Sequence, residues 1–464
     1  MPLERLLGGI DVLRAQGDFG AAMVTAVVHD SRAVVPGALF CCLVGSRSDG
    51  HDHAAGAVSA GAVALLGQRP LDVDVPQVVV ADTRAAMAPV AASFFDHPSR
   101  RLAVAGITGT NGKTTATHLL GAVLEAAGRP SAVIGTLTGA RTTPEAPELQ
   151  GRLAEMAGRG VQAVAMEVSS HALVQHRVDA TWFEVVAFTN LSQDHLDYHA
   201  SMDEYFAAKS SLFDPDRARV GVINVDDPWG RRLSEATALP VRPFSMADAT
   251  DLELNRDGST FRWEGHVVRL RLAGEFNVVN ALAAAAVARE LAVAPDAVAA
   301  GLSALASVPG RFERVDGGGP IAVFVDYAHT PAGLEHVLEA GRPLGRRVLV
   351  VFGCGGDRDR GKRPAMGEVA TRLADVAVLT SDNPRSEDPL AIIEEVRSGV
   401  RRPEVLTVEP DRRTAIALAL AEAGAGDVVI IAGKGHETTL VSGGREEPFD
   451  DRAVARELLS EMSP

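Results

Sequence analysis

The sequence of 464 residues is 46% hydrophobic and 23% charged, the composition of a globular protein long enough for about three domains. Its formal net charge of -15 at pH 7 argues against a nucleic-acid-binding protein, which needs a basic face. No uncharged apolar run approaches the ~18 residues of a membrane span, the first residues lack a signal-peptide pattern, and the three cysteines have no disulfide or zinc spacing. We therefore expect a soluble cytoplasmic protein.

Residues 1–97 alternate short apolar runs with helical stretches and predict a first α/β domain. Thr83 is expected to cap an Ala-rich helix, and the polar stretch 96–101 behind that helix is typical of a linker. Two loops, 30–32 and 45–50, contain Ser and Arg residues that could bind a diphosphate or a sugar, although a solvated turn is the commoner explanation. The expected strands are 37–44, 63–66 and 78–81.

A glycine-rich stretch, residues 106–115, follows a short apolar strand and precedes an amphipathic helix that Gly128 ends. Strand, glycine-rich turn, Lys-Thr and helix together predict a phosphate-binding loop, although the spacing is not the strict G-x-x-x-x-G-K-[ST]. Lys113 would reach the outer phosphates of a nucleotide triphosphate, and the Thr114 hydroxyl would bind magnesium. The expected nucleotide-binding residues of the loop are Gly109, Thr110, Asn111, Gly112, Lys113, Thr114 and Thr115.

Further apolar runs in residues 98–313 predict a central domain with a mostly parallel sheet. Ligands of such sheets bind at the carboxyl ends of the strands. Glu167, Asn190 and His195 follow strands there, on the same rim as Lys113. The expected strands after the first are 163–166, 183–188 and 220–223.

Residues 314–464 repeat the pattern and predict a third domain similar to a Rossmann module, without a dinucleotide fingerprint of its own. Four apolar strands each deliver polar residues to the same sheet edge. The stretch 309–313 between the last two domains is a plausible hinge. The expected strands are 323–325, 348–352, 376–380 and 428–431.

Eight motifs in order make almost the whole chain resemble the Mur ligases of peptidoglycan precursor synthesis. Within that family the chain is similar to the enzymes that add meso-diaminopimelate to UDP-N-acetylmuramoyl-L-alanyl-D-glutamate. The resemblance implies a UDP-binding first domain, a central ATPase domain and an amino-acid-binding third domain, in a monomer. The motifs occupy residues 108–115, 142–147, 166–171, 189–199, 326–331, 355–364, 382–385 and 433–437.

The activity implied is an ATP-dependent ligase reaction through an acyl phosphate on the D-glutamate side chain, which an amine then attacks. Thr114 and Glu167 are the expected ligands of one magnesium ion. Lys209 matches the lysine that the family carbamylates with carbon dioxide, and with His195 it would hold a second ion. The resemblance therefore implies Lys113, Lys209, His195 and Glu167 as catalytic residues.

The resemblance also assigns the substrate-binding residues. For the nucleotide it implies, beyond the phosphate-binding loop, Asn277 at the adenine, and Arg311, Asp326 and His329 from the hinge and the third domain. The UDP-dipeptide would contact Ser31, Ser46, Arg47 and Ser48 in the first domain, and Thr142, Thr143, Ser169, Gln175 and Arg177 in the second.

Diaminopimelate differs from lysine by a carboxylate on the carbon that bears its distal amine. The planar guanidinium of Arg385 suits that carboxylate, because it can donate two parallel charge-assisted hydrogen bonds. Without the resemblance, Asp-Asn-Pro-Arg at 382–385 is better explained as a proline-containing turn. The implied diaminopimelate-binding residues are Arg358, Asp382, Asn383, Pro384, Arg385, Gly433 and Glu437.

Two other functions remain open from the sequence. One is a related ligase with another acceptor, such as a folylpolyglutamate synthase or a lysine-adding enzyme, against which residues 382–385 and the first domain argue. The other is a catalytically inactive ATP-binding regulator, which would be expected to lack Lys113, Glu167 or Lys209, all of which are present.

Overall fold

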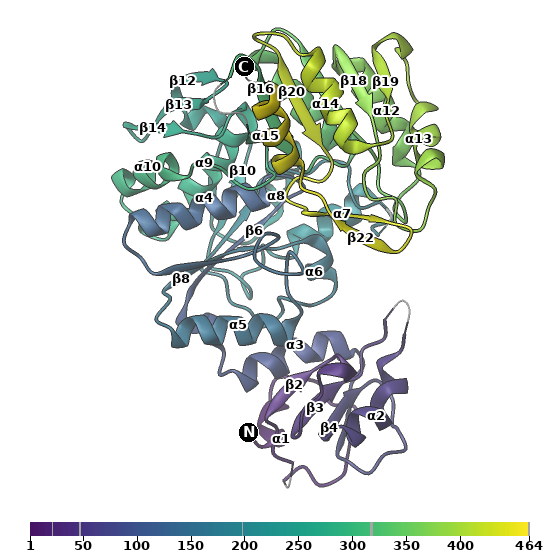
Figure 1. The fold of residues 1–464 in the computed structure, drawn as a ribbon. Helices are drawn as coiled ribbons and strands as arrows, with labels where there is room; N and C mark the ends of the chain where they lie inside the picture. The colour runs from purple at the N-terminus through teal and green to yellow at the C-terminus, as the bar shows by residue number, and fades with distance from the viewer. Residues whose placement is uncertain (21, 46–47, 197, 316–318, 463–464) are drawn as a thin grey trace.

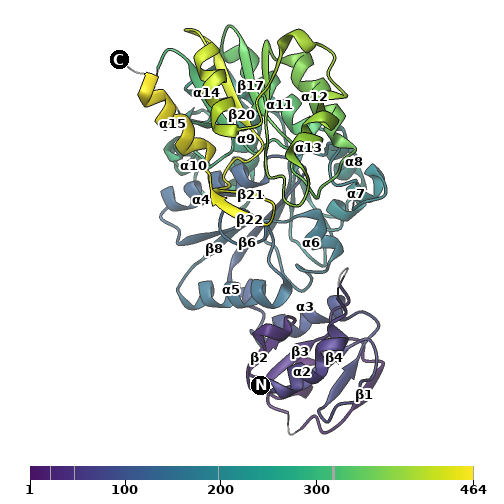
Figure 2. The same cartoon turned by 45° about the vertical axis from the view of Figure 1, so that its right-hand side comes forward.

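The computed structural model describes residues 1–20, 22–45, 48–196, 198–315 and 319–462. It contains three α/β units in chain order, with the N-terminal unit at one end of an elongated molecule (Figure 1). A turn of the view shows that this unit meets the rest of the chain near α3 and α5 (Figure 2). None of the described helices is long and apolar enough to cross a membrane.

The N-terminal sheet has the strand order β1-β5-β4-β3-β2, in which β1 is antiparallel to β5 and the other neighbours are parallel. Its expected strands are confirmed, although the first of them is only four residues long. The expected helix cap at Thr83 is wrong, because the Asp82 carboxylate accepts the free N–H groups of Arg84 and Ala85. The elements are β1 (Arg14–Gln16), β2 (Ala26–Val28), β3 (Ala38–Cys41), β4 (Ala62–Gly67), β5 (Gln77–Val79), α1 (Leu3–Leu6), α2 (Ala54–Ser59) and α3 (Thr83–Phe94).

The central sheet is parallel throughout, in the order β11-β10-β9-β6-β8-β7. Successive residues of β6 face opposite sides, so Val104 packs with α5–α8 whereas Ala105 and Ile107 pack with α4, α9 and α10. Burial on both faces explains why these strands are apolar without alternation. The elements are β6 (Ala103–Thr108), β7 (Ser131–Ile134), β8 (Ala163–Glu167), β9 (Val185–Phe188), β10 (Gly221–Asn224), β11 (Val241–Phe244), α4 (Lys113–Ala126), α5 (Ala146–Gly158), α6 (Ser170–Val174), α7 (Met202–Ser210), α8 (Pro228–Ala236), α9 (Glu275–Glu290) and α10 (Pro295–Ala304).

A small antiparallel sheet, β12 (Thr250–Asn255), β13 (Gly258–Trp263) and β14 (His266–Leu270), was not expected from the sequence. Its apolar side chains pack on the core around α4 and α9. Glu264 and Gly265 join β13 to β14 with φ of 46° and 82°, the two positive values that a tight hairpin turn requires. The signal that could have predicted it is the alternation of apolar and polar residues on both sides of Glu-Gly, in 261–263 and 268–270.

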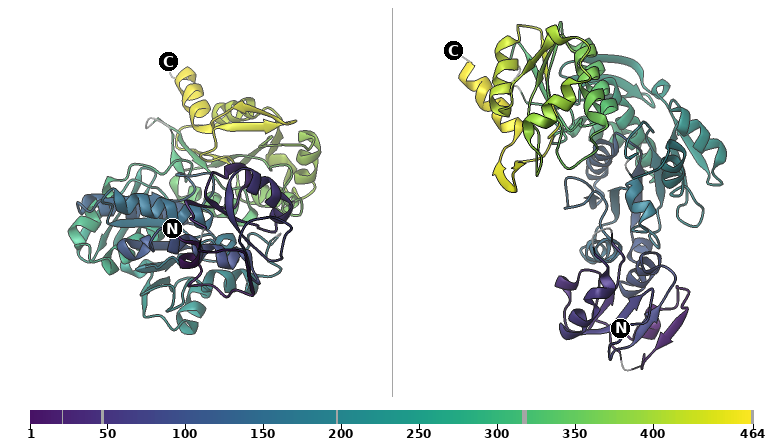
Figure 3. Two further views of the ribbon diagram at one scale, coloured as in Figure 1. Left: turned by 90° about the horizontal axis from the view of Figure 1, so that it is seen from below. Right: turned by 90° about the vertical axis from the view of Figure 1, so that its right-hand side faces the viewer.

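The C-terminal sheet has the order β15-β16-β20-β17-β18-β19, and all neighbours except β15 and β16 are parallel. Helices α11–α13 cover one face and α14 and α15 the other, and the four expected strands are confirmed. The right-hand view of Figure 3 shows this unit adjoining the central one, on the side away from the N-terminal sheet. The elements are β15 (Glu313–Arg314), β16 (Ala322–Asp326), β17 (Val348–Phe352), β18 (Val376–Leu379), β19 (Leu406–Val408), β20 (Val428–Ala432), β21 (Thr439–Ser442), β22 (Arg445–Pro448), α11 (Pro331–Gly341), α12 (Lys362–Leu373), α13 (Pro389–Arg397), α14 (Arg412–Glu422) and α15 (Asp451–Met462).

Candidate active site

A cavity of 580 Å³ lies between the carboxyl edge of the central sheet and the start of the C-terminal unit. Both units contribute to its wall, so their relative position determines its shape. Residues expected at the site from the sequence that line this cavity are Thr110, Asn111, Gly112, Lys113, Thr114, Thr115, Thr142, Glu167, Ser169, His195, Lys209, Arg311, Asp326 and His329.

The glycine-rich loop contains two glycines that no other residue could replace without a clash. Gly109 has φ of 151°, and a Cβ there would lie 1.9 Å from the Thr189 hydroxyl. Gly112 has φ of 84°, and its Cβ would lie 2.1 Å from the Asn280 amide oxygen. Both positions favour glycine by conformation as well as by space, which keeps the loop close to its neighbours.

Lys113 begins α4, and its ammonium group folds back over the loop. Its Nζ donates to the carbonyl oxygens of Gly109 at 2.8 Å and Thr110 at 2.7 Å. Burial lowers the pKa of Lys113, partly offset by the Glu167 carboxylate. The cation is therefore held at the mouth of the phosphate-binding loop, where an anion can take over its hydrogen bonds.

Thr114 and Glu167, the two residues expected from the sequence to bind magnesium, meet at the end of β8. The Thr114 hydroxyl donates to Glu167 Oε2 at 2.9 Å, and the Thr136 N–H and hydroxyl donate to the same carboxylate at 2.8 and 3.2 Å. Gly135 allows this approach, because a Cβ there would lie 2.2 Å from Glu167 Oε1. Two adjacent oxygen donors on a cavity wall suit magnesium, which keeps several waters. Thr136 was not expected at the site.

Lys209, on α7, is fully buried beside the loop, and its Nζ donates to the Gly109 carbonyl at 2.7 Å. The Nζ also lies 4.6 Å from the centre of the Tyr205 ring. Burial, together with the neighbouring charge of Lys113, lowers the pKa of Lys209 well below its usual value. The amine is thus biased toward its neutral, nucleophilic form, the form that reacts with carbon dioxide.

His195 has φ of 54°, a backbone conformation uncommon outside glycine. Its imidazole lies 4.7 Å from that of His171, centre to centre, and its Nε2 is 3.6 Å from the Asp194 carboxylate. Burial lowers the pKa of His195 to about 4, so the ring is neutral at pH 7 and able to act as a ligand. Within the described part of the chain, no cluster of three or more His, Cys, Asp or Glu side chains could hold a metal.

Arg311 connects the two units at the hinge. Its Nη2 donates to the Thr114 hydroxyl at 3.2 Å, and its guanidinium lies 4.7 Å from the centre of the Tyr327 ring. Asp326, at the end of β16, accepts the N–H groups of Phe312 and Ala328 at 2.6 and 2.7 Å. Burial raises the pKa of Asp326 to about 6, with Arg311 acting in the opposite direction.

The expected adenine contact, Asn277, lies buried in α9 and does not line the cavity. Its amide donates to the Ala273 carbonyl and accepts from Asn280. Phe276 and Val279 of the same helix do line the cavity and present apolar surface beside Asn280. His329 lines it from the opposite unit, with its Nδ1 2.8 Å from the Tyr327 carbonyl.

The expected dipeptide-binding residues of the central unit lie together near the Glu167 end of β8. The Thr143 hydroxyl donates to the Glu167 carbonyl, and the Ser169 hydroxyl caps α6. Arg177 donates to the Thr143 carbonyl at 3.0 Å and to Gln175 at 2.6 Å. Thr142 lies 3.0 Å from Thr136, oxygen to oxygen.

The first unit contributes none of the described residues that line the cavity. Ser31 begins a short 3-10 helix that the Asp30 carboxylate caps, and the Ser48 hydroxyl lies 2.8 Å from His53 Nε2. Ser46 and Arg47, also expected to contact the UDP-dipeptide, lie outside the described residues.

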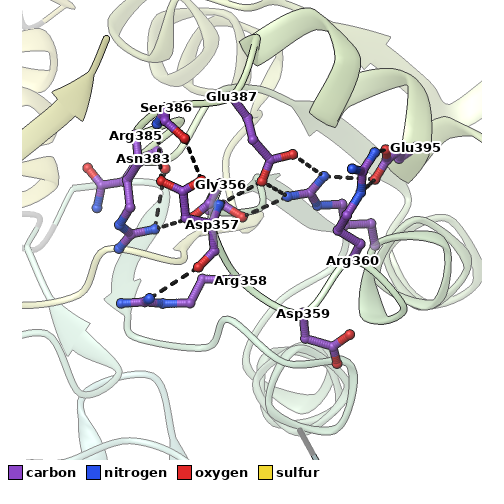
Figure 4. A network of polar contacts seen from close by, with 12 residues as sticks. Gly356, Asp357, Arg358, Asp359, Arg360, Asn383, Arg385, Ser386, Glu387 and Glu395 are labelled. Atoms are coloured by element: carbon purple, nitrogen blue, oxygen red, sulfur yellow. Dashed lines mark hydrogen bonds and ion pairs between the residues drawn. The ribbon is translucent and has the colours of Figure 1, made fainter. Parts of the chain in front are cut away.

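The residues expected to bind diaminopimelate form a second cluster on the C-terminal sheet edge, and Figure 4 shows Arg358, Asn383 and Arg385 of this set. Arg385 Nη1 donates to the Gly356 and Asn383 carbonyls at 2.7 and 3.4 Å. Arg358 is exposed, and its Nη1 donates to the Asp357 carbonyl at 3.2 Å. The two guanidinium groups extend to the same side of the network in the figure. Pro384 lies between Asn383, whose carbonyl accepts the Gly356 N–H, and Arg385, whose N–H donates to the Val441 carbonyl.

Asn383 and Glu437 are connected by Lys434, a buried lysine that was missed at the sequence level. Lys434 Nζ donates to Asn383 Oδ1 at 3.2 Å and to the Thr439 carbonyl, and it lies 3.5 Å from Glu437 Oε2. Asn383 Nδ2 donates to Glu437 Oε2 at 2.8 Å. The position of Lys434 inside the motif 433–437 was the available signal.

Gly433 has φ of 119°, and a Cβ there would lie 2.4 Å from Asp382 Oδ2. That carboxylate oxygen is buried and has no hydrogen-bond partner among the described residues. Asp382 Oδ1 accepts the Asn383 N–H at 2.7 Å. The polar residues at the ends of β18 and β20 therefore meet, as expected of parallel strands.

Three family models match successive parts of the chain. They are the Mur ligase family catalytic domain over residues 23–110, the Mur ligase middle domain over 107–288, and the Mur ligase glutamate ligase domain over 310–435. A protein of Geobacillus kaustophilus is 46% identical, with 94% of this chain and 95% of the relative covered. The chain is a Mur ligase.

Two further relatives extend the comparison. A Solibacter usitatus protein is 45% identical, with 99% of this Mur ligase and 98% of the relative covered. Both curated relatives are named UDP-N-acetylmuramoyl-L-alanyl-D-glutamate--2,6-diaminopimelate ligase. A solved structure of a ligase with the same name has a TM-score of 0.71 and 31% identity, and covers 100% of this chain and 99% of its own. The three-unit α/β fold is therefore that of the Mur ligases.

Proposed function

We propose that this Mur ligase uses ATP to join meso-diaminopimelate to the D-glutamate side-chain carboxyl of UDP-N-acetylmuramoyl-L-alanyl-D-glutamate, a step of peptidoglycan precursor synthesis. The observation that carries the proposal is the pairing of two sites. A phosphate-binding loop with Lys113, Thr114 and Glu167 opens into a cavity shared with the C-terminal unit, and that unit carries the Arg385 cluster.

Each of the three units would bind a different substrate, and the boundaries between them would lie between residues 97 and 98 and between residues 313 and 314. The first would hold the UDP group, the central one ATP, and the third the amino acid. Each of the three large sheets lies within one of these segments, except that strand β15 of the C-terminal sheet spans the second boundary. We propose that the enzyme acts as a monomer, and the three buried unpaired cysteines favour the cytoplasm.

ATP must first phosphorylate the D-glutamate carboxylate, because a carboxylate is a poor electrophile. Lys113 would neutralise charge on the transferred phosphoryl group, and Arg311 would hold the phosphates from the hinge. Thr114 and Glu167 would hold a magnesium ion, which supplies further charge neutralisation. Closure of the third unit would exclude water from the acyl phosphate and bring the amine to it.

Arg385 would bind the carboxylate that distinguishes diaminopimelate from lysine, and Glu437 would pair with the distal ammonium. Lysine would leave the guanidinium desolvated and unpaired, which costs roughly 3 kcal/mol or more. The choice of amino acid thus depends on one arginine and its orientation.

The function is tested by an amino-acid panel at fixed ATP and UDP-dipeptide, with ADP release as the readout. We expect ADP release to require both the UDP-dipeptide and an amino acid, and diaminopimelate to exceed lysine at least a hundredfold in kcat/KM. Equal use of lysine would contradict the specificity. Absence of ADP release with all three substrates would indicate a regulator rather than an enzyme.

Lys209 is proposed to carry a carbamate, which with His195 would hold a second magnesium ion. The buried position and the lowered pKa of Lys209 support this modification. We expect isotope-labelled bicarbonate to give a carbamate signal in wild-type protein by NMR and none in Lys209→Ala, whose activity bicarbonate will not restore. An active Lys209→Ala variant would exclude the role.

A further inference from the structure

Two loops carry the arginines of the proposed diaminopimelate site. The first, residues 353–361, follows β17 and contains Arg358, and the second, residues 382–388, follows β18 and contains Arg385. Neither loop belongs to a helix or strand over most of its length. Their arginines can select a substrate only if something fixes the two loops relative to each other.

The loops are joined directly at several points. Gly356 N–H donates to the Asn383 carbonyl at 2.9 Å, and a Cβ on Gly356 would lie 1.9 Å from the Pro384 carbonyl oxygen. The Ser386 N–H and hydroxyl donate to the Asp357 carboxylate at 3.2 and 2.6 Å. The contact is therefore made by backbone and side chain from both loops.

Asp357 and Arg385 both have positive φ, of 54° and 55°. Non-glycine residues rarely adopt this conformation and hold it where the surroundings impose it. One strained residue lies in each loop, and both belong to the joined region. The network must therefore contain groups strong enough to keep this geometry.

Arg363 and Glu387 are those groups. Arg363, in the first turn of α12, is fully buried, and its Nη1 and Nη2 donate to the two Glu387 oxygens at 2.9 and 2.8 Å. Its Nη2 also donates to the Gly355 carbonyl at 3.3 Å. Glu387 Oε1 in turn accepts the Asp357 N–H at 2.6 Å. A bidentate ion pair thus connects a helix to both loops.

Among the described residues, the second carboxylate on Arg363 meets the two loops only at the side chain of Arg360, two residues past Arg358. Glu395, on α13, accepts from Arg363 Nη1 at 2.7 Å and pairs with the exposed Arg360. Figure 4 shows Glu395 at the far side of the network from Arg358 and Arg385. Glu395 therefore provides a matched control, because its loss removes one ion pair from the same guanidinium.

We propose that Arg363 and Glu387 are positioning residues for diaminopimelate, which hold the loops of Arg358 and Arg385 in the geometry that favours diaminopimelate over lysine. This inference rests on the proposed function. Glu387 acts through the Asp357 N–H and through Arg363, and would make no contact with the amino acid itself. Arg385 Nη1 is held by two carbonyls, which leaves its other donors for the substrate carboxylate.

The test compares Glu387→Gln with Glu395→Gln. Glutamine at 387 keeps the size of the side chain but directs an amide N–H against the guanidinium, whose groups are all donors. We expect Glu387→Gln to raise KM for diaminopimelate tenfold or more and to lower the diaminopimelate-to-lysine ratio of kcat/KM by a similar factor. KM for ATP should stay within twofold, and Glu395→Gln should leave all three values within twofold.

A double variant separates positioning from general destabilisation. In an Arg385→Ala background, Glu387→Gln should change KM for diaminopimelate less than it does in wild type, because only Arg358 of the two arginines that it orients remains. Equal changes in KM for ATP and diaminopimelate, or an unchanged effect of Glu387→Gln without Arg385, would overturn the proposal. A wild-type enzyme that does not use diaminopimelate would instead contradict the proposed function.

Discussion

Single residues at the nucleotide site are constrained by close approach more than by their own chemistry. Glycine is required at positions 112 and 109 because the loop passes so close to Asn280 and Thr189 that a Cβ would clash with them. Glu167 reaches Thr114 because Gly135 has no side chain. At this scale, the chemistry of Lys113 and Glu167 depends on neighbours that are themselves inert.

Gly112→Ala should lower the rate of ADP release a hundredfold or more. Its Cβ would lie 2.1 Å from the Asn280 amide oxygen, and a φ of 84° disfavours alanine. Gly128 provides the control. It follows the same helix with φ of 65°, and no atom lies within 4 Å of its Cβ position. Gly128→Ala should cost about 1 kcal/mol of unfolding free energy and leave turnover unchanged. Equal loss of activity in both variants would contradict the steric argument.

Asp326 should make stability depend on pH. Its folded pKa, raised by burial to about 6, exceeds the unfolded value of 3.8, so the folded state binds the proton more tightly. This contribution is present below pH 4 and is lost as pH rises through 6. The unfolding free energy of Asp326→Asn relative to wild type should therefore rise between pH 4 and pH 7, by at most about 3 kcal/mol. Denaturant titrations at several pH values measure this difference in unfolding free energy, and a difference that does not change with pH would refute the prediction.

At the scale of elements, the helices on the outer face of the C-terminal sheet are fixed by one buried ion pair. Arg412, at the start of α14, donates from Nε and Nη2 to the two Asp451 oxygens of α15, both at 2.7 Å. Both side chains are fully buried. Arg412 also donates to the Ser381 and Ala432 carbonyls, at the ends of β18 and β20. The pair therefore ties two helices to the edge that carries the amino-acid site.

Arg412→Met should lower the unfolding free energy by about 3–5 kcal/mol, because it leaves the Asp451 carboxylate buried without its partner. The adjacent Arg413 is partly exposed and its ion pair with Glu457 is solvated, so Arg413→Met should leave the unfolding free energy nearly unchanged. Replacing Asp451 by methionine in the Arg412→Met background should recover part of the loss. Thermal and denaturant unfolding provide the measurement, and similar values for the two single variants would disprove the argument.

At the scale of the whole molecule, one contact at the hinge and one between the first two units concern the proposed reaction. Arg311 of the hinge reaches Thr114 of the phosphate-binding loop. Glu145, just before α5, lies between Arg84 of α3 and Arg177, at 3.6 and 3.0 Å. Arg177 is one of the proposed dipeptide-binding residues, so Glu145 couples the position of the N-terminal unit to that site.

Glu145→Gln should raise KM for the UDP-dipeptide about tenfold and leave KM for ATP within twofold. The variant removes the charge that holds Arg84 and Arg177 together, while the phosphate-binding loop is untouched. Glu148→Gln is the control, since Glu148 lies one turn along α5, is exposed and forms a local ion pair with Arg152. Steady-state kinetics with each substrate varied in turn give the result. A change in KM for ATP as large as that for the UDP-dipeptide would argue against this role.

The sequence by itself determined the three α/β units, most of their strands, and the phosphate-binding loop. Apolar runs and glycine-rich turns are local signals, and they report burial and backbone conformation directly. The same local patterns predicted which residues lie on the carboxyl edges of the sheets. The antiparallel hairpins at 250–270 were missed, although their turn at Glu264 carried a recognisable signal.

Only the tertiary structure decided which of these edges meet. It separated Asn277 from the cavity and brought Thr136 to Glu167, Lys434 to Asn383 and Arg363 to Glu387. Such partners lie up to 51 residues apart in the chain, and no local pattern records them. A buried charge needs a partner in space because desolvation must be offset, and the fold alone chooses that partner.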